Sequence, residues 1–489
     1  MTTLVESKIG GDRAVTENRD RITIVNPATD ADIAEVVLAT ESDVDDAVSA
    51  ALAAQKVWAA QPIAARAETM WKFSLLLDEH AQELLDMDIA NTGRTIRDAR
   101  VEGMALGRIT RHWAGSVDKI FGQQIPTRDG ELTYTKRLPV GVVAAITPWN
   151  APAVSTVQRI ASAIACGNAS IVKPSEWTPL SSRKIADLAV EAGMPEGLVS
   201  LIVGDGKAGH ALASHPDVGA VRFTGGIETG QRIAHAAADT FKKVTLELGG
   251  KSPNIVFADA DLDLALRGSV WGVFSNSGQI CCAGSRLLVE DSIADEFIER
   301  LSAMASRIRV GDPRNEATHM GPLSFRRHYE RVLNYIDIAK GEGAKVVMGG
   351  GRPSDIGSAG CYIAPTIFDS VRPDFRIAQE EVFGPLLSII RFSNEDEALK
   401  IANGTIHGLA SIVWTRDIDR ALRVSDGIDA GNVWVNTSRA YGPTLPFSGF
   451  KASGVGNAMS EGAIEGCTRL KRVTIAYGGA QGTPGWDDI

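Results

Sequence analysis

A carboxylate, a thiol and a side-chain amide occur in glycine-rich or proline-containing segments in the first two thirds of this chain. Glu247 ends an apolar run that continues as Leu-Gly-Gly-Lys-Ser-Pro, and Cys281 lies within Gly-Gln-Ile-Cys-Cys-Ala-Gly. A carboxylate can activate a nucleophile or a water molecule, and a thiolate can attack a carbonyl carbon. Asn150, in Thr-Pro-Trp-Asn, adds an amide that can donate to a developing oxyanion. The three residue types together predict covalent catalysis at a carbonyl group.

Seven motifs follow one another along the chain: TPWN, KPSEWTP, FTGG, LELGGKSP, GQICCAG, EEVFGP and PFSGFKASG. In order and spacing the set resembles the NAD(P)-dependent aldehyde dehydrogenase superfamily, over residues 24–475. Seven ordered motifs are far more specific than any one of them. The resemblance implies an enzyme of the hydrolytic, non-acylating type, with NAD as cofactor and a small-molecule aldehyde as substrate.

Composition limits the other classes of function. The 489 residues exceed the usual size of one core, so we expect two or three domains. A net charge of −10 argues against binding nucleic acid or anionic membranes. The N-terminus has no signal-peptide character, and no stretch approaches the roughly 20 apolar residues of a membrane span. The sequence therefore predicts a cytoplasmic protein.

The cysteines are few, odd in number and mostly scattered, at positions 166, 281, 282, 361 and 467. This usage is typical of a reducing compartment and of no disulfide framework. Cys281 and Cys282 are adjacent, so they cannot form half of a CxxC knuckle, and no histidine cluster lies near them in the sequence. We expect no metal site.

Strand and helix patterns alternate twice along the chain. Apolar strands are predicted at 141–147, 170–173, 199–203, 218–223 and 243–248, with helices at 153–166, 181–192, 206–214 and 230–237. Five such strands predict an open parallel sheet of the dinucleotide-binding kind. A second run from residue 255 predicts another α/β domain, which would present Cys281 to the first across a cleft. Its predicted helices are 262–276, 294–308 and 325–340, and its strands are 286–289, 345–348, 386–391 and 410–413.

The remaining segments complete the predicted fold. Residues 1–20 are polar and expected to be loosely held, and 42–83 have helical periodicity. Residues 132–137 are predicted to form a strand in an extended flap, and 467–476 an edge strand that pairs elsewhere, with a partner subunit as one option. The fold class is α/β of the aldehyde dehydrogenase type. We expect a Rossmann-type NAD-binding domain (1–117 and 138–247), a catalytic domain (248–448), and a small β oligomerisation flap with a C-terminal tail (118–137 and 449–489). The resemblance implies a homodimer or homotetramer.

Two glycine loops are candidates for the cofactor phosphates. The run 204–209 has the form GxGxxG, but it follows the third strand, and Asp205 would direct a carboxylate toward the phosphates. The resemblance places this loop, including Gly209, near the adenine. It favours Gly225, Gly226 and Gly230 for the pyrophosphate, at the helix N-terminus that follows. Two glycine turns without a ligand are the alternative.

Lys173, Ser175 and Glu176 follow a strand directly, at the carboxyl edge where α/β sheets bind ligands. A Lys and a Glu there can bind the hydroxyls of an adenosine ribose. Glu176 would also repel a 2′-phosphate, which favours NAD over NADP. A solvated charge pair in a strand-end loop is the alternative.

The resemblance adds further cofactor residues and assigns the catalytic roles. Glu381 and Phe383, in Glu-Glu-Val-Phe-Gly-Pro, are implied to contact the nicotinamide-side ribose and the nicotinamide. A solvated acidic pair is the alternative there. Further implied contacts are Ile146, Thr147, Pro148, Trp149, Phe223 and Leu248. The cysteine after Gly-Gln-X is the implied nucleophile, which is Cys281, and Cys282 would face the interior. Asn150 and the Cys281 backbone N–H would hold the oxyanion, and Glu247 would activate water.

The sequence departs from the resemblance near the phosphates, in the C-terminal segment and in the substrate tunnel. FTGS is Phe-Thr-Gly-Gly here, and Gly-Arg-Glu is Gly-Asn-Ala at 456–458. Tunnel positions that are aromatic in enzymes for small aldehydes are Ala151 and Gln158, whereas Tyr441 and Phe447 stay aromatic. This predicts a larger or more polar aldehyde than acetaldehyde. Arg159 and Arg439 are candidate anchors for a substrate carboxylate. A salt bridge is the favoured interpretation for Arg159 and an equal alternative for Arg439.

Other functions remain to be distinguished. A CoA-acylating dehydrogenase would share the fold, but such relatives generally lack the glutamate found here at 247. A thiol esterase would use the cysteine and glutamate without NAD, and the predicted ribose and phosphate motifs argue against it. A catalytically silent binding protein would not be expected to keep the cysteine, glutamate and asparagine together.

Overall fold

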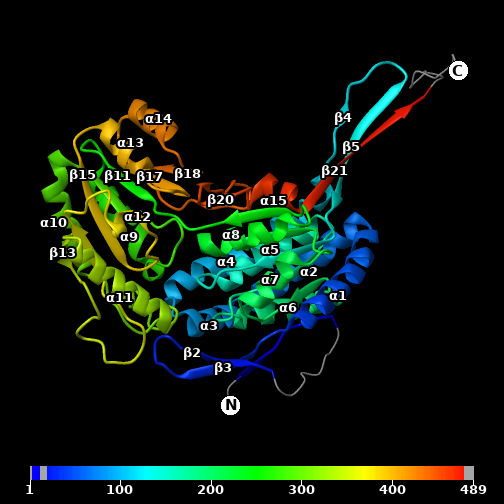
Figure 1. Cartoon of the computed structure of the whole chain (residues 1–489), viewed down its shortest axis with the longest axis horizontal. Coiled ribbons are helices and arrows are strands. Elements are labelled where there is room, and N and C mark those ends of the chain that lie inside the picture. The colour runs from blue at the N-terminus through cyan, green and yellow to red at the C-terminus, as the bar shows by residue number, and fades with distance from the viewer. Residues whose placement is uncertain (1–2, 11–18, 478–489) are drawn as a thin grey trace.

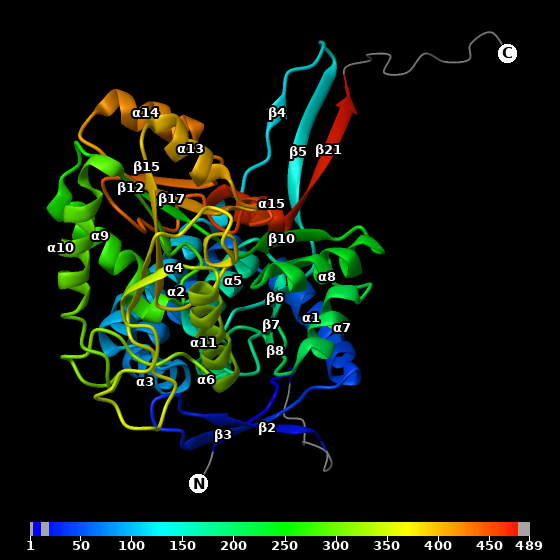
Figure 2. The same ribbon diagram turned by 60° about the vertical axis from the view of Figure 1, so that its left-hand side comes forward.

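Two large β-sheets, each covered by helices, form two lobes of the molecule in a computed structural model that describes residues 3–10 and 19–477 (Figure 1). A narrow group of strands projects away from both lobes, and Figure 2 shows that the C-terminal strand runs along it. The α/β fold class predicted from the sequence is confirmed.

The first sheet contains the five predicted parallel strands. Its order is β20-β10-β9-β6-β7-β8, and the sixth strand, β20, pairs antiparallel with β10 at the edge. The prediction of a purely parallel sheet was therefore incomplete. The strands are β6 (Val142–Ile146), β7 (Ala169–Lys173), β8 (Val199–Leu201), β9 (Ala220–Thr224), β10 (Lys243–Glu247) and β20 (Gly454–Val455). The helices between them are α5 (Pro152–Ala165), α6 (Leu180–Glu191), α7 (Gly206–Ser214) and α8 (Ile227–Ala238).

The helical N-terminal region extends further than its periodicity predicted. It comprises α1 (Glu41–Ala60), α2 (Ile63–Glu79), α3 (Ala81–Thr92), α4 (Ile96–Ala114) and the short 3₁₀ turn η1 (Val117–Lys119). A three-stranded sheet precedes it, with β1 (Thr3–Val5), β2 (Arg21–Val25) and β3 (Asp32–Val37). The prediction that residues 1–20 are loosely held is wrong for β1, whose three residues pair with β3. For residues 11–18 that prediction lies outside the described residues.

The second sheet has the order β13-β14-β15-β12-β11-β17-β18 and is parallel except for β13. Ile255 and Val256 on β11 lie in apolar clusters on opposite faces of the sheet, which explains the continuous apolar strands in the sequence. The strands are β11 (Pro253–Val256), β12 (Arg286–Glu290), β13 (Lys345–Met348), β14 (Thr366–Asp369), β15 (Leu386–Phe392), β17 (Ala410–Trp414) and β18 (Asn432–Val435). The helices are α9 (Leu262–Phe274), α10 (Ala294–Ala305), α11 (Arg326–Gly341), α12 (Arg376–Gln379), α13 (Glu395–Asn403) and α14 (Ile418–Gly427). The 3₁₀ turns η2 (Ser275–Gly278) and η3 (Asp291–Ile293), and the short pair β16 (His407–Gly408) and β19 (Phe450–Lys451), complete this part of the chain.

The projecting sheet consists of β4 (Gln124–Ile125), β5 (Glu131–Pro139) and β21 (Thr468–Ala476), in the order β21-β5-β4. The tail strand β21 follows α15 (Ser460–Cys467) and pairs along its whole length with β5 of the same chain. The tail is the predicted edge strand, and within the chain it pairs with β5, while pairing with a partner subunit stays a prediction. Assembly into a homodimer or homotetramer stays a prediction, as do the domain boundaries, whose first and last segments include residues outside the described ranges.

The chain first crosses from one large sheet to the other at a short segment, and it returns to the first sheet between β18 and β20. Glu247 is the last residue of β10, and Pro253 is the first residue of β11. Residues 248–252 therefore bridge the two sheets. No helix in residues 3–10 and 19–477 combines the length and apolarity that crossing a membrane requires.

Candidate active site

Glu247 lies at the crossing with its carboxylate in a buried environment. The residue is 5% exposed, and neither carboxylate oxygen has a hydrogen bond of ordinary geometry from the described residues. Burial raises the pKa of Glu247 to about 8, although the nearby Arg159 guanidinium opposes this shift. A carboxylate with this pKa is suited to accept a proton near neutral or mildly alkaline pH.

The loop that carries Cys281 leaves α9 through an unusual backbone. Asn276, Ser277 and Gly278 have positive φ values of 49°, 56° and 73°. Two of the three are not glycine, so this left-handed turn costs conformational energy and must be held by its surroundings. The Gln279 side chain does this by donating to the Asn276 carbonyl (3.1 Å) and accepting from Ser324 N–H (2.9 Å). The turn thus fixes the backbone immediately before the thiol.

Two glycines allow three segments to converge on this loop. A Cβ added at Gly250 would lie 2.5 Å from the Cys281 carbonyl oxygen, and one at Gly249 would lie 2.0 Å from Glu381 Oε2. Any larger residue would therefore push Cys281 or Glu381 away from the crossing. Consistent with this proximity, Glu381 and Glu247 both contribute to raising the pKa of the Cys281 thiol. Thiol and base are thus brought together by the Leu-Gly-Gly sequence.

Asn150 lies on the other side of the loop, after β6. Its Nδ2 donates to the Gln279 carbonyl oxygen at 2.8 Å, which leaves a second amide hydrogen for another acceptor. The Cys281 backbone N–H donates no hydrogen bond within the described part of the chain. Two donors, one from a side chain and one from the backbone, are therefore available next to the Cys281 sulfur.

The two adjacent cysteines have different surroundings. The hydrogen bond between the two thiols raises the pKa of Cys281 and lowers the pKa of Cys282. Burial and nearby charges raise the pKa of Cys281 further. Charge alone would favour Cys282 as the thiolate. However, Cys282 is 0% exposed and its Sγ lies 2.7 Å from the Tyr441 hydroxyl, whereas Cys281 is partly exposed. Cys281 is therefore the sulfur that a substrate can reach.

Glu381 and Phe383 lie beside the crossing, as part of a larger cluster. Burial raises the pKa of Glu381 to about 7, and Gly250 N–H donates to its Oε1 at 3.1 Å. Phe383 has a positive φ of 63° and packs edge-on against Trp149 at 5.1 Å between ring centroids. His328 on α11 lies 5.0 Å from the Trp149 ring, and its Nε2 contacts the Phe383 carbonyl oxygen at 2.7 Å. Sequence reasoning missed His328, because no motif surrounds it.

The predicted adenosine residues gather at the carboxyl edge of the first sheet. Lys173 ends β7 and is buried, with its Nζ 3.9 Å from Glu176 Oε2. A Cβ added at Gly209 would lie 3.5 Å from Lys173 Cδ, so α7 passes close to this lysine. Ser175 Oγ accepts from Trp177 N–H within the same turn. Asp205 caps α7 by accepting from Lys207 N–H at 2.8 Å, so its carboxylate is directed at its own helix.

The second glycine loop opens α8. Gly226 is the N-cap, and nothing lies within 4 Å of the position that its Cβ would take. Gly225 N–H is already bonded to the Glu247 carbonyl oxygen at 3.1 Å, while Gly230 packs against Leu248. Phe223 packs against Gly225. The open N-terminus of this helix suits an anion, although Gly225 N–H is not free to contribute.

Thr147 completes the cofactor side of the site. Its hydroxyl is buried and has no hydrogen-bond partner in the described residues, and it lies in the motif that also contains Ile146, Pro148 and Trp149. An orphaned buried hydroxyl, a buried Lys173 beside the partly exposed Glu176 and an open helix N-terminus fit a ligand with ribose and phosphate groups. The residues present therefore fit a dinucleotide.

The predicted substrate residues separate into two groups. Ala151 precedes α5, on which Gln158 lies, and both are partly exposed. Tyr441 packs against Phe447, at 5.8 Å between ring centroids, and contacts Cys282. Arg439 stacks on Trp271, 3.3 Å from the ring centroid, and donates to Ser275 Oγ at 2.7 Å. Tyr441, Phe447 and Arg439 therefore lie on the side of the two adjacent cysteines, whereas a place for Ala151 and Gln158 in a substrate tunnel stays a prediction.

Arg159 was a weaker candidate for a substrate anchor, with a salt bridge as the favoured interpretation. Both expectations are wrong in detail. The residue is 4% exposed, and it donates to the Thr224 hydroxyl and the Ala458 carbonyl oxygen rather than to a carboxylate. Its guanidinium lies close enough to Glu247 to influence the pKa of that carboxylate.

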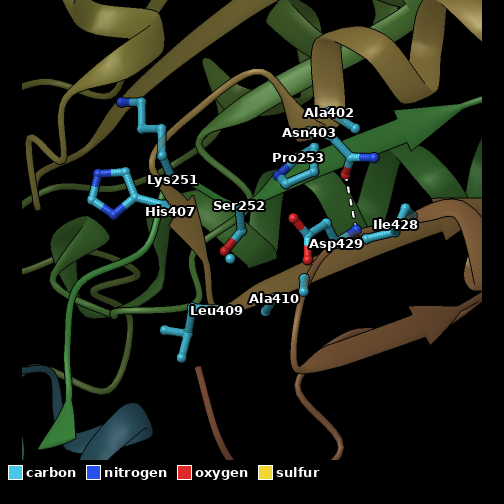
Figure 3. A pocket seen from close by; sticks show the side chains of 12 residues that line it. Lys251, Ser252, Pro253, Ala402, Asn403, His407, Leu409, Ala410, Ile428 and Asp429 are labelled. Carbon is cyan, nitrogen blue, oxygen red and sulfur yellow. Dashed lines mark hydrogen bonds between the residues drawn. The ribbon is translucent and has the colours of Figure 1, made fainter. Parts of the chain in front are cut away.

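A small cavity beside the crossing is not a substrate site. Its lining includes Lys251, Ser252, His407, Asn403 and Asp429, and its volume of about 10 Å³ suffices for a single water molecule at most (Figure 3). Asn403 Oδ1 accepts from Asp429 N–H at 2.9 Å, and the Lys251 side chain extends away from this pair. The described residues contain no group of three or more His, Cys, Asp or Glu that could hold a metal ion.

Comparison with known proteins agrees with this geometry. The family model described as the aldehyde dehydrogenase family matches residues 14–473. A putative aldehyde dehydrogenase from Burkholderia cenocepacia is 41% identical, with 99% of each chain covered and a TM-score of 0.96. PnpE from Pseudomonas sp. WBC-3 is 41% identical over 100% of each chain, with a TM-score of 0.96, and PnpE has also been solved with nicotinamide adenine dinucleotide. Betaine aldehyde dehydrogenase from Staphylococcus aureus, in complex with NAD⁺, is 34% identical over 98% of this chain and 95% of that chain, with a TM-score of 0.95.

Proposed function

The chain belongs to the aldehyde dehydrogenase family. We propose that it oxidises an aldehyde to its carboxylic acid through a thioester on Cys281, with Glu247 and Asn150 as the other catalytic residues. The observation that carries the proposal is the convergence of a reachable thiol, an unpaired buried carboxylate and two free donors around the 248–252 crossing. These are the groups that covalent catalysis at a carbonyl requires.

In the first step Cys281 Sγ bonds to the aldehyde carbon. The thiol pKa is raised, so it must lose its proton to attack, and Glu247 is the nearby acceptor. The carbonyl oxygen becomes an oxyanion that accepts from the remaining Asn150 amide hydrogen and from the Cys281 backbone N–H. Because both donors are fixed by the left-handed turn, little reorganisation accompanies the attack.

NAD is the cofactor that the residues suit. Glu176 and Lys173 would hold the adenosine ribose, the N-terminus of α8 the pyrophosphate, and Glu381 with Phe383 the nicotinamide end. When bound, the cofactor supplies a hydride acceptor for the tetrahedral adduct. The trio Trp149, Phe383 and His328 would exclude water from that end of the site.

Hydrolysis of the thioester returns the enzyme to its starting state. Glu247 first releases the Cys281 proton to solvent, and it then takes a proton from a water molecule as the water oxygen bonds to the acyl carbon. The carbon–sulfur bond breaks, and the Cys281 thiolate takes that proton back from Glu247 as the acid is released. A CoA-acylating enzyme would need no such base, so the carboxylate at 247 favours water as the acceptor. A thiol esterase without a redox role would leave the dinucleotide residues unexplained.

The proposal is tested by supplying NAD and a panel of aldehydes and following NADH absorbance. We expect NADH formation that requires both components and is not stimulated by coenzyme A. Addition of NAD alone should change the tryptophan fluorescence, because Trp149 lies in the motif proposed to contact it. Absence of both responses would leave the esterase as the better description.

The cofactor preference should be for NAD over NADP. Glu176 lies close to Lys173 at the proposed ribose site, and a 2′-phosphate there would meet a like charge. Such a contact costs about 1 to 3 kcal/mol at intermediate dielectric, so kcat/KM should favour NAD by about tenfold or more. The matched control is Glu176→Gln, which should reduce the ratio of kcat/KM with NAD to kcat/KM with NADP. A wild-type preference for NADP would contradict this assignment.

The best substrate should be larger or more polar than acetaldehyde. Ala151 and Gln158 leave space, and each additional methylene that is buried contributes about 0.8 kcal/mol, or roughly fourfold in kcat/KM. Arg439 has no carboxylate within ion-pair distance among the described residues, so a substrate carboxylate could take that place. We expect Arg439→Ala to lower kcat/KM selectively for carboxylated aldehydes. Acetaldehyde as the best substrate would refute the size argument. If Arg439→Ala leaves the relative kcat/KM values across the aldehydes unchanged, Arg439 does not bind a substrate carboxylate.

A further inference from the structure

Two arginines are buried behind Glu247 without a carboxylate partner. Arg159 on α5 is 4% exposed and Arg222 on β9 is 0% exposed. Arg159 donates to Thr224 Oγ1 at 2.7 Å and to the Ala458 carbonyl oxygen at 3.4 Å. Arg222 donates to the same Ala458 oxygen at 2.7 Å and to Ser162 Oγ at 2.5 Å. Neither guanidinium lies within 4.0 Å of an Asp or Glu oxygen in residues 3–10 and 19–477, so both buried charges lack an ion pair.

The sheet register places Arg159 next to the base. Thr224 and Glu247 are directly paired residues of the parallel strands β9 and β10, so their side chains lie on the same face of the sheet. The Arg159 guanidinium, bonded to the Thr224 hydroxyl, is therefore adjacent to the Glu247 carboxylate. A buried carboxylate that accepts no hydrogen bond of ordinary geometry and a buried cation without an ion pair are each costly alone, so their proximity stabilises both charges.

We propose that Arg159 is the fixed counter-ion of Glu247 and stabilises the ionised carboxylate that hydrolysis of the acyl-enzyme requires. The inference rests on the proposed role of Glu247 as the base. Arg159 is a positioning residue, because it touches neither the thiol nor the tunnel residues. Burial lowers the pKa of Arg159 to about 9, so at neutral pH the guanidinium stays protonated and acts as a fixed charge rather than as a proton carrier.

The other charged and titratable groups around this pair come from three further elements. Arg222 on β9 faces both Glu247 and Arg159, Cys281 faces Glu247 from the catalytic loop, and Cys467 at the end of α15 faces Arg159. Burial is the main influence on Glu247 and raises its pKa, and Arg159 is the largest influence that lowers it. Glu247 is mostly ionised, and can therefore act as a base, only at a pH above its pKa. Removing the Arg159 charge must therefore move the rise of base-dependent activity to higher pH.

The test measures deacylation without cofactor. A nitrophenyl ester acylates Cys281 by expelling nitrophenolate, and loss of the acyl group to water is followed by intact mass across pH. In the wild type the rate should rise with pH to a plateau. In Arg159→Gln the rise should move up by about one to three pH units, so that the rate at neutral pH falls about tenfold or more while the plateau is retained. Arg159→Lys keeps the charge and should stay near the wild type.

Two further variants keep the test decisive if Arg159→Gln folds poorly. Thr224→Val removes the hydrogen bond that holds the guanidinium and should give a smaller upward shift in the same direction. A uniform loss of rate at every pH in Arg159→Gln and Thr224→Val, with the position of the rise unchanged in both, would overturn the inference and assign Arg159 a purely structural role. If Glu247→Gln retains the wild-type rise and rate, the proposed function of Glu247 fails instead, which is a separate outcome.

Discussion

Replacing Cys281 with alanine will reduce aldehyde oxidation and ester hydrolysis to background, a loss of roughly 10⁴- to 10⁶-fold. The variant lacks the only sulfur at the crossing that a substrate can reach, and no oxygen nucleophile replaces it. NAD binding should be unchanged, because the proposed cofactor residues lie on other segments. Steady-state NADH formation, nitrophenyl ester hydrolysis and the fluorescence response to NAD measure the three properties.

The matched control is Cys282→Ala, which should retain most of the activity. Cys282 is fully buried, and its removal costs its hydrogen bonds with Tyr441 and Cys281, each about 1 kcal/mol in the free energy of unfolding. If the Cys282 variant is inactive while the Cys281 variant turns over, the two thiols have been assigned in the wrong order.

Replacing Glu247 with glutamine should separate the two halves of the reaction. An amide cannot take a proton from water, so the thioester on Cys281 should accumulate and the steady-state rate should fall by about 10²- to 10⁴-fold. Rapid mixing with NAD and aldehyde should show at most one equivalent of NADH per site, followed by very slow turnover. Above pH 8 the wild-type enzyme should gain rate because its base is ionised there, and the variant should not.

A variant with undiminished turnover would remove Glu247 from the mechanism. A variant that forms no NADH burst at all would assign Glu247 chiefly to activation of the thiol, since the raised pKa of Cys281 also requires a proton acceptor. The burst amplitude and the steady-state rate therefore distinguish the two uses of the same carboxylate.

The parallel strands could be predicted, and the three residues proposed as catalytic could be selected, because their signals are local. Continuous apolar runs such as the one ending at Glu247 occur where a strand is buried on both faces, and they are visible without tertiary information. The catalytic residues lie in compact motifs, and the glycines at 249 and 250 proved to be positions where a Cβ would collide with Glu381 or Cys281. In these places local sequence and tertiary packing agree.

The parts that sequence reasoning missed depend on contacts between distant segments. The two residues of β20 have no periodicity to detect, yet they pair with β10 at Glu247. The tail strand has β propensity, but only the structure identifies β5 as its partner. His328 was missed and Arg159 was given a different role, because the contacts of these two buried helix residues with Phe383 and Thr224 form only across the fold.

The most direct test of the account is the mass of the Glu247→Gln enzyme after one turnover with NAD and an aldehyde. We predict one acyl group per chain, in equal amount to the NADH formed, located on the peptide that contains Cys281 and removed by hydroxylamine. Mapping by tandem mass spectrometry, with Cys282→Ala in the same background, should place the group on Cys281. NADH formation without any covalent acyl group, or an acyl group on Cys282, would contradict the proposed mechanism.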